Sequence, residues 1–300
     1  MNYFWDLFLG GITRGSIYAL IALGYTMVYG ILELINFAHG EIYMIGAFTA
    51  LIVASLLTMQ GFTGIAVVIM ATIVAVLYAA AYGFSVEKIA YKPLRQAPRL
   101  SPLISAIGMS IFLQNYVMLA QTSDFLPFPN LLQYMELPAS ISQWIAPSEF
   151  TIIFTAALLM LGLTLILKFT KMGKAMRAVA QDRAMAMLLG VNVNRIISRT
   201  FIIGSALAAI GGVLIASHVG RINFYIGFGA GIKAFTAAVL GGIGSIPGAM
   251  LGGLVLGLTE SFAAGYISSD YENVFAFALL ILILILKPEG LLGRSSQQKV

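Results

Sequence analysis

The chain has 300 residues, of which 60% are hydrophobic and only 10% are charged, and its mean hydropathy is +0.94. Soluble domains carry roughly 25% charged residues, so this composition excludes an ordinary soluble domain and indicates an integral membrane protein. The chain has no cysteine, which excludes disulfides, thiol nucleophiles and thiolate metal sites.

Nine apolar segments follow one another along the chain, and their lengths approach the ~17 to 25 residues that a helix needs to cross a bilayer. They cover residues 8–31, 41–58, 63–83, 102–122, 150–167, 200–217, 226–243, 248–264 and 273–287. We therefore expect an all-α polytopic membrane protein with eight to ten transmembrane segments and one membrane domain over residues 1–300. Because the beginning carries Asp6 and no basic leader, we expect the first helix to be retained.

Basic residues are concentrated in three segments. Of the 17 Lys and Arg, four lie within 85–100, seven within 168–199 and three after residue 286, whereas residues 123–148 contain none. By the positive-inside rule, the three basic segments face the cytoplasm. This places the C-terminus in the cytoplasm and, with nine crossings, the N-terminus outside.

A polar stretch separates the first two apolar segments and recurs later in the chain. INFAHGEIYMIGAFTA, residues 35–50, agrees with INFYIGFGAGIKAFTA, residues 222–237, at nine of 16 positions in one register without gaps. Five crossings separate the helices before the two copies, so the copies insert with opposite orientation. We predict two inverted-topology halves with interrupted helices, as in many transporters. Residues 1–122 form the first half, 150–199 a linking helix and cytoplasmic loop, and 200–287 the second half.

The two breaks are candidate parts of a translocation path. Backbone N–H groups at the start of a half-helix can bind a carboxylate, and ionisable groups at membrane depth are costly and often functional. The candidate residues are Asn36, Phe37, His39, Gly40, Glu41, Asn223, Phe224, Lys233 and Glu260. Alternatives remain open: Glu41 caps its own helix, Lys233 and Glu260 form a structural ion pair, or the breaks are gates without a stereospecific site.

The basic loop KFTKMGKAMRAVAQDRAMAMLLGVNVNRIISR, residues 168–199, has apolar residues at helical spacing. This pattern predicts one amphipathic helix over 174–189 that ends at Gly190. The helix either lies on the lipid surface or docks a partner, since residues 184–190 resemble the cytoplasmic coupling loop of bacterial ABC importer permeases. The pattern of that family is Glu-Ala-Ala, three further residues and then Gly. Here Ala184 and Met185 replace the glutamate and the first alanine, while Ala186 and Gly190 match. The residues assigned to coupling are Gly173, Arg177, Ala180, Asp182, Ala184, Ala186 and Gly190.

The glycine run GGIGSIPGAMLGG, residues 241–253, lies between the last apolar segments. Pro247 replaces the last glycine of a dinucleotide fingerprint, and no P-loop pattern occurs in the chain, so we expect ATP to be bound by partner subunits only. We predict that Gly241, Gly244, Pro247 and Gly248 form a tight turn between packed helices. No other metal-ligating residues stand at metal-site spacing from His39 or His218, so we expect no metal site.

Four stretches, at residues 15–48, 103–116, 173–191 and 233–253, are together similar to the permease subunits of bacterial high-affinity branched-chain amino acid ABC importers (LivH-type). The resemblance implies an inner-membrane permease, not an enzyme, that translocates leucine, isoleucine and valine. It also implies a second homologous permease, two cytoplasmic ATPase subunits and a periplasmic amino acid-binding protein, with no cofactor and no nucleic acid. A stand-alone secondary transporter or channel is the alternative. A membrane anchor for another enzyme is a third function, which the polar helix breaks disfavour.

Overall fold

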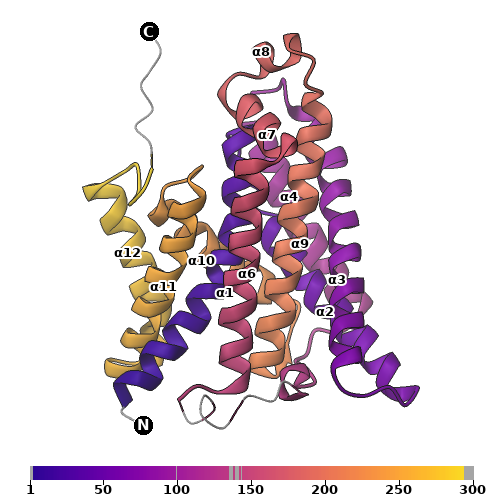
Figure 1. Ribbon diagram of the computed structural model, residues 1–300, viewed down its shortest axis with the longest axis vertical. Coiled ribbons are helices and arrows are strands. Elements are labelled where there is room, and N and C mark those ends of the chain that lie inside the picture. The colour runs from indigo at the N-terminus through magenta and orange to yellow at the C-terminus, as the bar shows by residue number, and fades with distance from the viewer. Residues whose placement is uncertain (1–2, 99, 135–137, 139–141, 143, 294–300) are drawn as a thin grey trace.

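The computed structural model describes residues 3–98, 100–134, 138, 142 and 144–293, and these residues form a helical bundle (Figure 1). Within these ranges, eight helices are long and apolar enough to cross a membrane, and one shorter apolar helix spans Ile226–Gly241. The predicted all-α polytopic fold is confirmed. Three of the basic residues counted above, Arg99, Arg294 and Lys299, lie outside the described residues.

The elements follow one another in chain order. The helices are α1 (Tyr3–Leu32), α2 (His39–Met59), α3 (Ile65–Val86), α4 (Leu100–Ala120), α6 (Pro147–Phe169), α7 (Lys171–Gln181), α8 (Arg183–Leu188), α9 (Val193–Val219), α10 (Ile226–Gly241), α11 (Ile246–Tyr266) and α12 (Glu272–Leu286). α3 continues through a π-helical turn, Glu87–Tyr91, and a 3-10 turn, Lys92–Leu94, and further 3-10 turns cover Leu131–Tyr134 and Ser269–Tyr271. Two short strands, β1 (Leu126–Pro127) and β2 (Arg221–Ile222), pair antiparallel.

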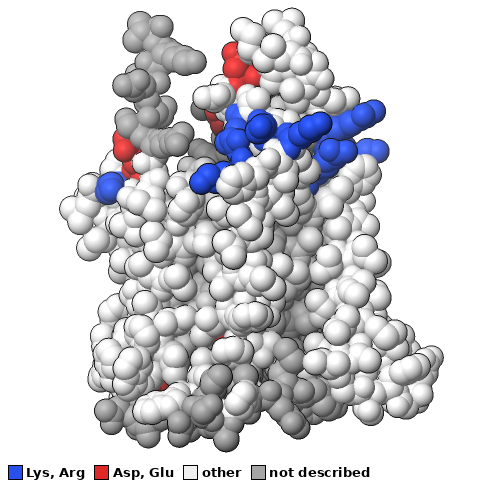
Figure 2. All heavy atoms as spheres, viewed as in Figure 1, with Lys and Arg blue, Asp and Glu red and all other residues white. Residues whose placement is uncertain are grey.

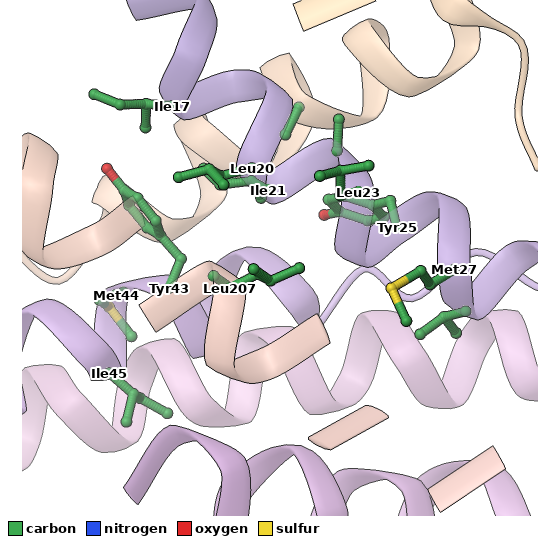
Figure 3. Close-up of a cluster of buried hydrophobic side chains, with 14 of the residues drawn as sticks. Ile17, Leu20, Ile21, Leu23, Tyr25, Met27, Tyr43, Met44, Ile45 and Leu207 are labelled. Carbon is green, nitrogen blue, oxygen red and sulfur yellow. The ribbon is translucent and has the colours of Figure 1, made fainter. Parts of the chain in front are cut away.

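α1 is the central helix of the bundle. More than half of its residues are buried, and it packs against α9, α10 and α11. In Figure 3, Ile17, Leu20 and Ile21 of α1 lie in one cluster with Tyr43 of α2 and Leu207 of α9. Lipid tails are as apolar as these side chains, so close packing rather than the hydrophobic effect holds such helices together.

Small residues bring α1 and α11 close together. Gly11 and Gly15 on α1 and Gly253 and Gly257 on α11 each stand four residues apart, so each pair lies on one helix face. A Cβ added to Gly15 would lie 2.8 Å from the Leu254 Cα. The crossing therefore depends on the missing side chains, as in other small-residue contacts between membrane helices.

The chain leaves the helical conformation between α1 and α2 and again between α9 and α10. α1 ends at residue 32 and α9 at 219, while α2 begins at 39 and α10 at 226, so both boundaries recur in the same register as the repeated sequence. The His39 N–H donates to the Asn36 carbonyl at 3.0 Å, and the Ile226 N–H donates to the Asn223 carbonyl at 3.3 Å. The residues that recur in the sequence therefore adopt the same local turn.

The predicted single helix over residues 174–189 is wrong. The chain instead turns at Asp182, whose extended φ of −157° and ψ of 111° separate α7 from α8. The Asp182 side chain accepts a hydrogen bond from the Met185 N–H at 3.0 Å, and this cap begins a new helix. Gly190 follows α8 with a φ of 81°, a conformation that glycine adopts readily at helix ends.

Basic side chains gather at one end of the bundle. Figure 2 shows most of the visible Lys and Arg in a band at the height of α7 and below α8, while the rest of this face is nearly devoid of them. The beginning of α1 and the end of α12 lie at opposite ends of the bundle (Figure 1). On this face, basic side chains are therefore concentrated at the end of the bundle where α12 ends.

Candidate functional site

The first turns of α2 and α10 meet inside the bundle. Gly40 and Gly227, which occupy equivalent positions in the two copies of the repeat, are in close backbone contact. A Cβ added to Gly227 would lie 2.7 Å from the Gly40 carbonyl oxygen, and one added to Gly40 would collide with the Gly227 carbonyl oxygen. Glycine at both positions allows the two backbones to approach this closely.

The start of α2 lies deep in the bundle, beside the middle of α1 rather than beside its end. His39, the first residue of α2, packs against Gly24, and its ring lies edge-on to Tyr25 with 4.8 Å between the ring centroids. Gly24 precedes the end of α1 by eight residues, which corresponds to about 12 Å along a helix. The chain therefore re-enters the bundle before α2 begins, as expected for an interrupted helix.

A cavity of about 170 Å³ lies beside this crossing, between α4 and α10. Its lining is largely apolar and aromatic, with few polar side chains; the residues are Tyr25, Phe37, Ile107, Ser110, Ile111, Gln114, Tyr225, Gly227, Phe228, Gly231 and Ile232. An apolar lining with few polar groups is typical of small-molecule sites, and pockets for drug-sized ligands measure ~300 to 1,000 Å³. This cavity therefore suits a smaller solute.

The Glu41 carboxylate lies directly behind the cavity wall, against the lining residues Ser110 and Gly227. The residue is 1% exposed, and its Oε1 accepts a hydrogen bond from the Ser110 hydroxyl at 3.1 Å. Its Oε2 has no hydrogen-bond partner among the described residues and lies 2.5 Å from the position that a Cβ on Gly227 would take. The N-cap of α2 is Ala38. Glu41 thus bonds to α4, and no hydrogen bond from its side chain caps α2.

Gln114 lines the same cavity one helical turn beyond Ser110 on α4. Its Nε2 is buried and has no hydrogen-bond partner among the described residues. Buried polar atoms without partners are uncommon because each retains an uncompensated desolvation cost. An unused acceptor on Glu41 and an unused donor on Gln114 therefore lie at or just behind the cavity wall. The sequence alone did not identify Gln114 or Ser110.

The side chains of the two asparagines of the breaks bond to groups within the fold and are not among the cavity's lining residues. Asn36 Oδ1 accepts a hydrogen bond from the Tyr91 hydroxyl at 3.0 Å, and Asn223 Oδ1 accepts one from the Tyr225 N–H at 3.2 Å. Of the two phenylalanines, Phe37 lines the cavity, whereas Phe224 packs edge-on to Tyr225.

Lys233 and Glu260 are close together, but they belong to a larger ionic cluster. The Lys233 ammonium lies 3.2 Å from Glu260 Oε1 and 2.6 Å from Glu272 Oε1. The other Glu260 oxygen accepts a hydrogen bond from the Tyr18 hydroxyl at 2.7 Å, and Arg14 lies 3.2 Å from Glu272. Two cations and two anions from α1, α10, α11 and α12 thus compensate one another, as charges at membrane depth require. This is the geometry of a structural ion cluster.

The assigned coupling residues lie at the basic end of the bundle. The Arg177 guanidinium donates to the Leu167 carbonyl, Asp182 begins α8, and Gly173 and Ala186 are buried against the bundle, whereas Ala180 and Ala184 are exposed. Apolar side chains on and just after α8 are exposed: Met185 (53%), Met187 (57%), Leu188 (81%) and Leu189 (75%).

Arg183 connects this end of the bundle to α1. Its Nε and Nη2 both donate to the Ile31 carbonyl, at 3.2 and 2.6 Å. Ile31 is the next-to-last residue of α1, immediately before the first helix break. A single side chain therefore joins the start of α8 to the helix that leads into the break, a contact that the sequence did not reveal.

Gly241, Gly244, Pro247 and Gly248 lie at the turn between α10 and α11. A Cβ on Gly241 would collide with the Gly248 carbonyl oxygen, and Gly244 has a φ of 91°. Pro247 lies in the first turn of α11, which Ser245 caps by accepting a hydrogen bond from the Gly248 N–H at 3.2 Å.

In the part of the chain that the structure describes, no three His, Cys, Asp or Glu are arranged to hold a metal ion.

Comparison with known proteins finds relatives over almost the whole chain. A family model described as "Branched-chain amino acid transport system / permease component" matches residues 7–284. The chain is 50% identical over 302 residues to the high-affinity branched-chain amino acid transport system permease protein LivH of Escherichia coli (strain K12), covering 99% of this chain and 98% of that one. It is 52% identical over 296 residues to the corresponding protein BraD of Pseudomonas aeruginosa, covering 97% and 96%.

Proposed function

The chain belongs to the family of branched-chain amino acid transport permeases, and from this membership we propose that it carries leucine, isoleucine and valine across the bacterial inner membrane. It is the permease subunit of an ABC importer rather than an enzyme, and a separate subunit hydrolyses ATP. The observation that carries this proposal is about 50% identity to LivH and BraD over nearly their full lengths.

The exposed apolar side chains of α8 are the proposed docking site for an ATPase subunit. α8 projects beyond the band of basic side chains (Figures 1 and 2), and basic residues mark the cytoplasmic side. The exposed Met185, Leu188 and Leu189 side chains are therefore directed away from the bilayer, which disfavours a lipid-surface role. Exposed apolar patches of this kind mark protein interaction sites. In this orientation the C-terminus is cytoplasmic.

The two copies of the repeat are the proposed cores of inverted halves. In support, the helix boundaries recur in the register of the repeated sequence, and equivalent turn hydrogen bonds precede α2 and α10. α1 packs on α11 while α9 packs on α3, and the contact of α2 with α3 is matched by that of α10 with α11. The importer would be completed by a second permease, two ATPase subunits and a periplasmic binding protein, with the path beside the crossing of α2 and α10.

Uptake of labelled leucine into vesicles containing the complete importer tests this function. We expect uptake that requires ATP, the ATPase subunits and the binding protein. Leu188→Asp combined with Leu189→Asp should abolish both uptake and co-purification of the ATPase, with the thermal unfolding of the permease unchanged. Phe62→Asp, at another exposed apolar position, in the α2–α3 loop, is the control and should retain the ATPase. Uptake without ATP or ATPase subunits would instead support a stand-alone transporter.

A further inference from the structure

We propose that the cavity between α4 and α10 binds both charged groups of an α-amino acid: the Glu41 carboxylate holds the ammonium group, and the Gln114 amide donates to the carboxylate. This inference rests on the proposed function, because it assigns a binding site in the permease to the solute that the importer carries. The two side chains come from different helices, α2 and α4, which meet only in the folded bundle.

Glu41 has the burial and the unused hydrogen-bonding capacity that an ammonium site requires. One carboxylate oxygen is held by Ser110, and the other has no partner among the described residues. Its two immediate neighbours, Ser110 and Gly227, both line the cavity. A buried carboxylate is costly unless a cation or several donors compensate it. An ammonium group entering the cavity would supply that compensation.

Gln114 is placed to bind the second charged group. Ser110, which holds Glu41, and Gln114 are four residues apart on α4, so their side chains lie on one face about 5 to 6 Å apart. Glu41 bonds to Ser110, so its carboxylate and the Gln114 amide lie beside neighbouring turns of α4. The proposed site places between them the ammonium and carboxylate groups that an α-amino acid carries on one carbon. An ionised carboxylate can only accept hydrogen bonds, and the Gln114 Nε2, which has no partner among the described residues, is a donor.

The remainder of the cavity suits a branched aliphatic side chain. Phe37, Ile107, Ile111, Phe228 and Ile232 line it, so a substrate side chain would meet almost only apolar atoms. The volume of about 170 Å³ leaves little room beyond a small amino acid. A polar side chain entering here would lose its hydrogen bonds to water without replacement.

The repeat argues against a purely structural role for Glu41. The residue equivalent to Glu41 in the second copy is Phe228, yet α10 begins with the same turn as α2. A carboxylate is therefore not needed to start the half-helix. Phe228 lines the cavity with its aromatic ring, and Glu41 bonds to Ser110 of the same lining and brings a carboxylate beside it. This asymmetry matches a solute that has one charged and one apolar end.

The test measures saturable binding of labelled leucine to the assembled permease–ATPase complex without the binding protein. The variants are Glu41→Gln, which keeps an acceptor for Ser110 but loses the charge, and Gln114→Met, which keeps the length but loses the donor. We expect each to weaken leucine binding by about tenfold or more, since a hydrogen bond to a charged group contributes roughly this factor. Controls are Asp6→Asn, an exposed carboxylate, and Asn115→Leu, the exposed amide next to Gln114; both should bind leucine normally.

Two competitors assign the roles. 4-Methylpentanoate is leucine without the ammonium group, so Glu41→Gln should reduce the preference of the complex for leucine over this acid. 3-Methylbutylamine is leucine without the carboxylate, so Gln114→Met should reduce the preference for leucine over this amine. ATPase stimulation by the loaded binding protein should persist in both variants, which shows that the complex remains assembled. If the wild-type importer takes up leucine but its complex shows no saturable binding, or if both variants bind normally, the site is wrong while the proposed function stands. If wild-type vesicles take up no leucine, the proposed function itself fails.

Discussion

Gly40 and Gly227 are in backbone contact although they belong to different copies of the repeat, and each lies in the first turn of a helix that follows a break. The contact joins α2 to α10, and Gly227 both lines the cavity and lies against Glu41. The geometry of this crossing therefore controls the shape of the proposed binding site. Substitutions at the crossing should affect stability and transport together.

Gly40→Ala tests how tightly this crossing is packed. The added methyl group would collide with the Gly227 backbone, and overpacking of this kind costs about 1 to 3 kcal/mol. We expect a lower unfolding temperature and a loss of leucine uptake. The control is Gly108→Ala in α4, where no atom lies within 4 Å of the added Cβ; it should raise stability by about 0.5 to 1 kcal/mol through helix propensity. Equal unfolding temperatures for the two variants would contradict the contact.

Asn36→Leu should be more harmful than Asn223→Leu, although the two residues are equivalent in the repeat. Asn36 accepts from the buried Tyr91 hydroxyl, whereas Asn223 accepts from a backbone N–H in an exposed turn. Losing Asn36 leaves a buried hydroxyl with weakened hydrogen bonding, which costs about 1 to 3 kcal/mol. Chemical unfolding of both variants measures the difference. A double-mutant cycle with Tyr91→Phe should give a coupling energy of about 1 kcal/mol for Asn36 and none for Asn223.

Lys233→Met should strongly destabilise the bundle. It leaves Glu260, which is 0% exposed, without its cation and removes the closest partner of Glu272. Breaking a buried ion pair from one side costs about 3 to 5 kcal/mol. Adding Glu260→Gln should restore much of the unfolding temperature, because the carboxylate that lacks a cation is then gone. If the unfolding temperature of the double variant is no higher than that of Lys233→Met, loss of the Lys233–Glu260 pair is not the cause of the destabilisation.

Arg183→Ala should reduce the coupling of ATP hydrolysis to transport. The side chain holds the Ile31 carbonyl at the end of α1, so without it α8 loses its direct hydrogen bonds to the helix that precedes the break. We expect a several-fold fall in leucine imported per ATP hydrolysed, with the ATPase still bound. Lys174→Ala, an exposed position on α7, is the matched control and should leave this ratio unchanged. An unchanged ratio for Arg183→Ala would show that the contact does not transmit motion.

Local sequence patterns predicted the helices and the two breaks well. All nine apolar segments contain a helix, and the INF stretches at 35–37 and 222–224 lie in the breaks. Length, hydropathy and turn-forming residues act over a few neighbouring positions, so they are readable without the fold. The loop at 168–199 was harder, because apolar periodicity continues across Asp182. Asp182 was the sequence signal for two helices instead of one, because aspartate is a preferred N-cap residue and its side chain caps α8 here.

The sequence by itself determined that this is a polytopic membrane protein with a repeated, polar helix break and a basic, helix-containing loop at one end. It also allowed an ion pair between Lys233 and Glu260 as one of two open alternatives, since the two residues lie on consecutive antiparallel helices. Only the tertiary structure decided that Glu272 and Arg14 complete this cluster, that Glu41 bonds to Ser110, and that Gln114 lies at the same cavity. The physical reason is that these contacts join helices distant along the chain, and their partners depend on how each helix is rotated and how closely glycine lets two backbones approach.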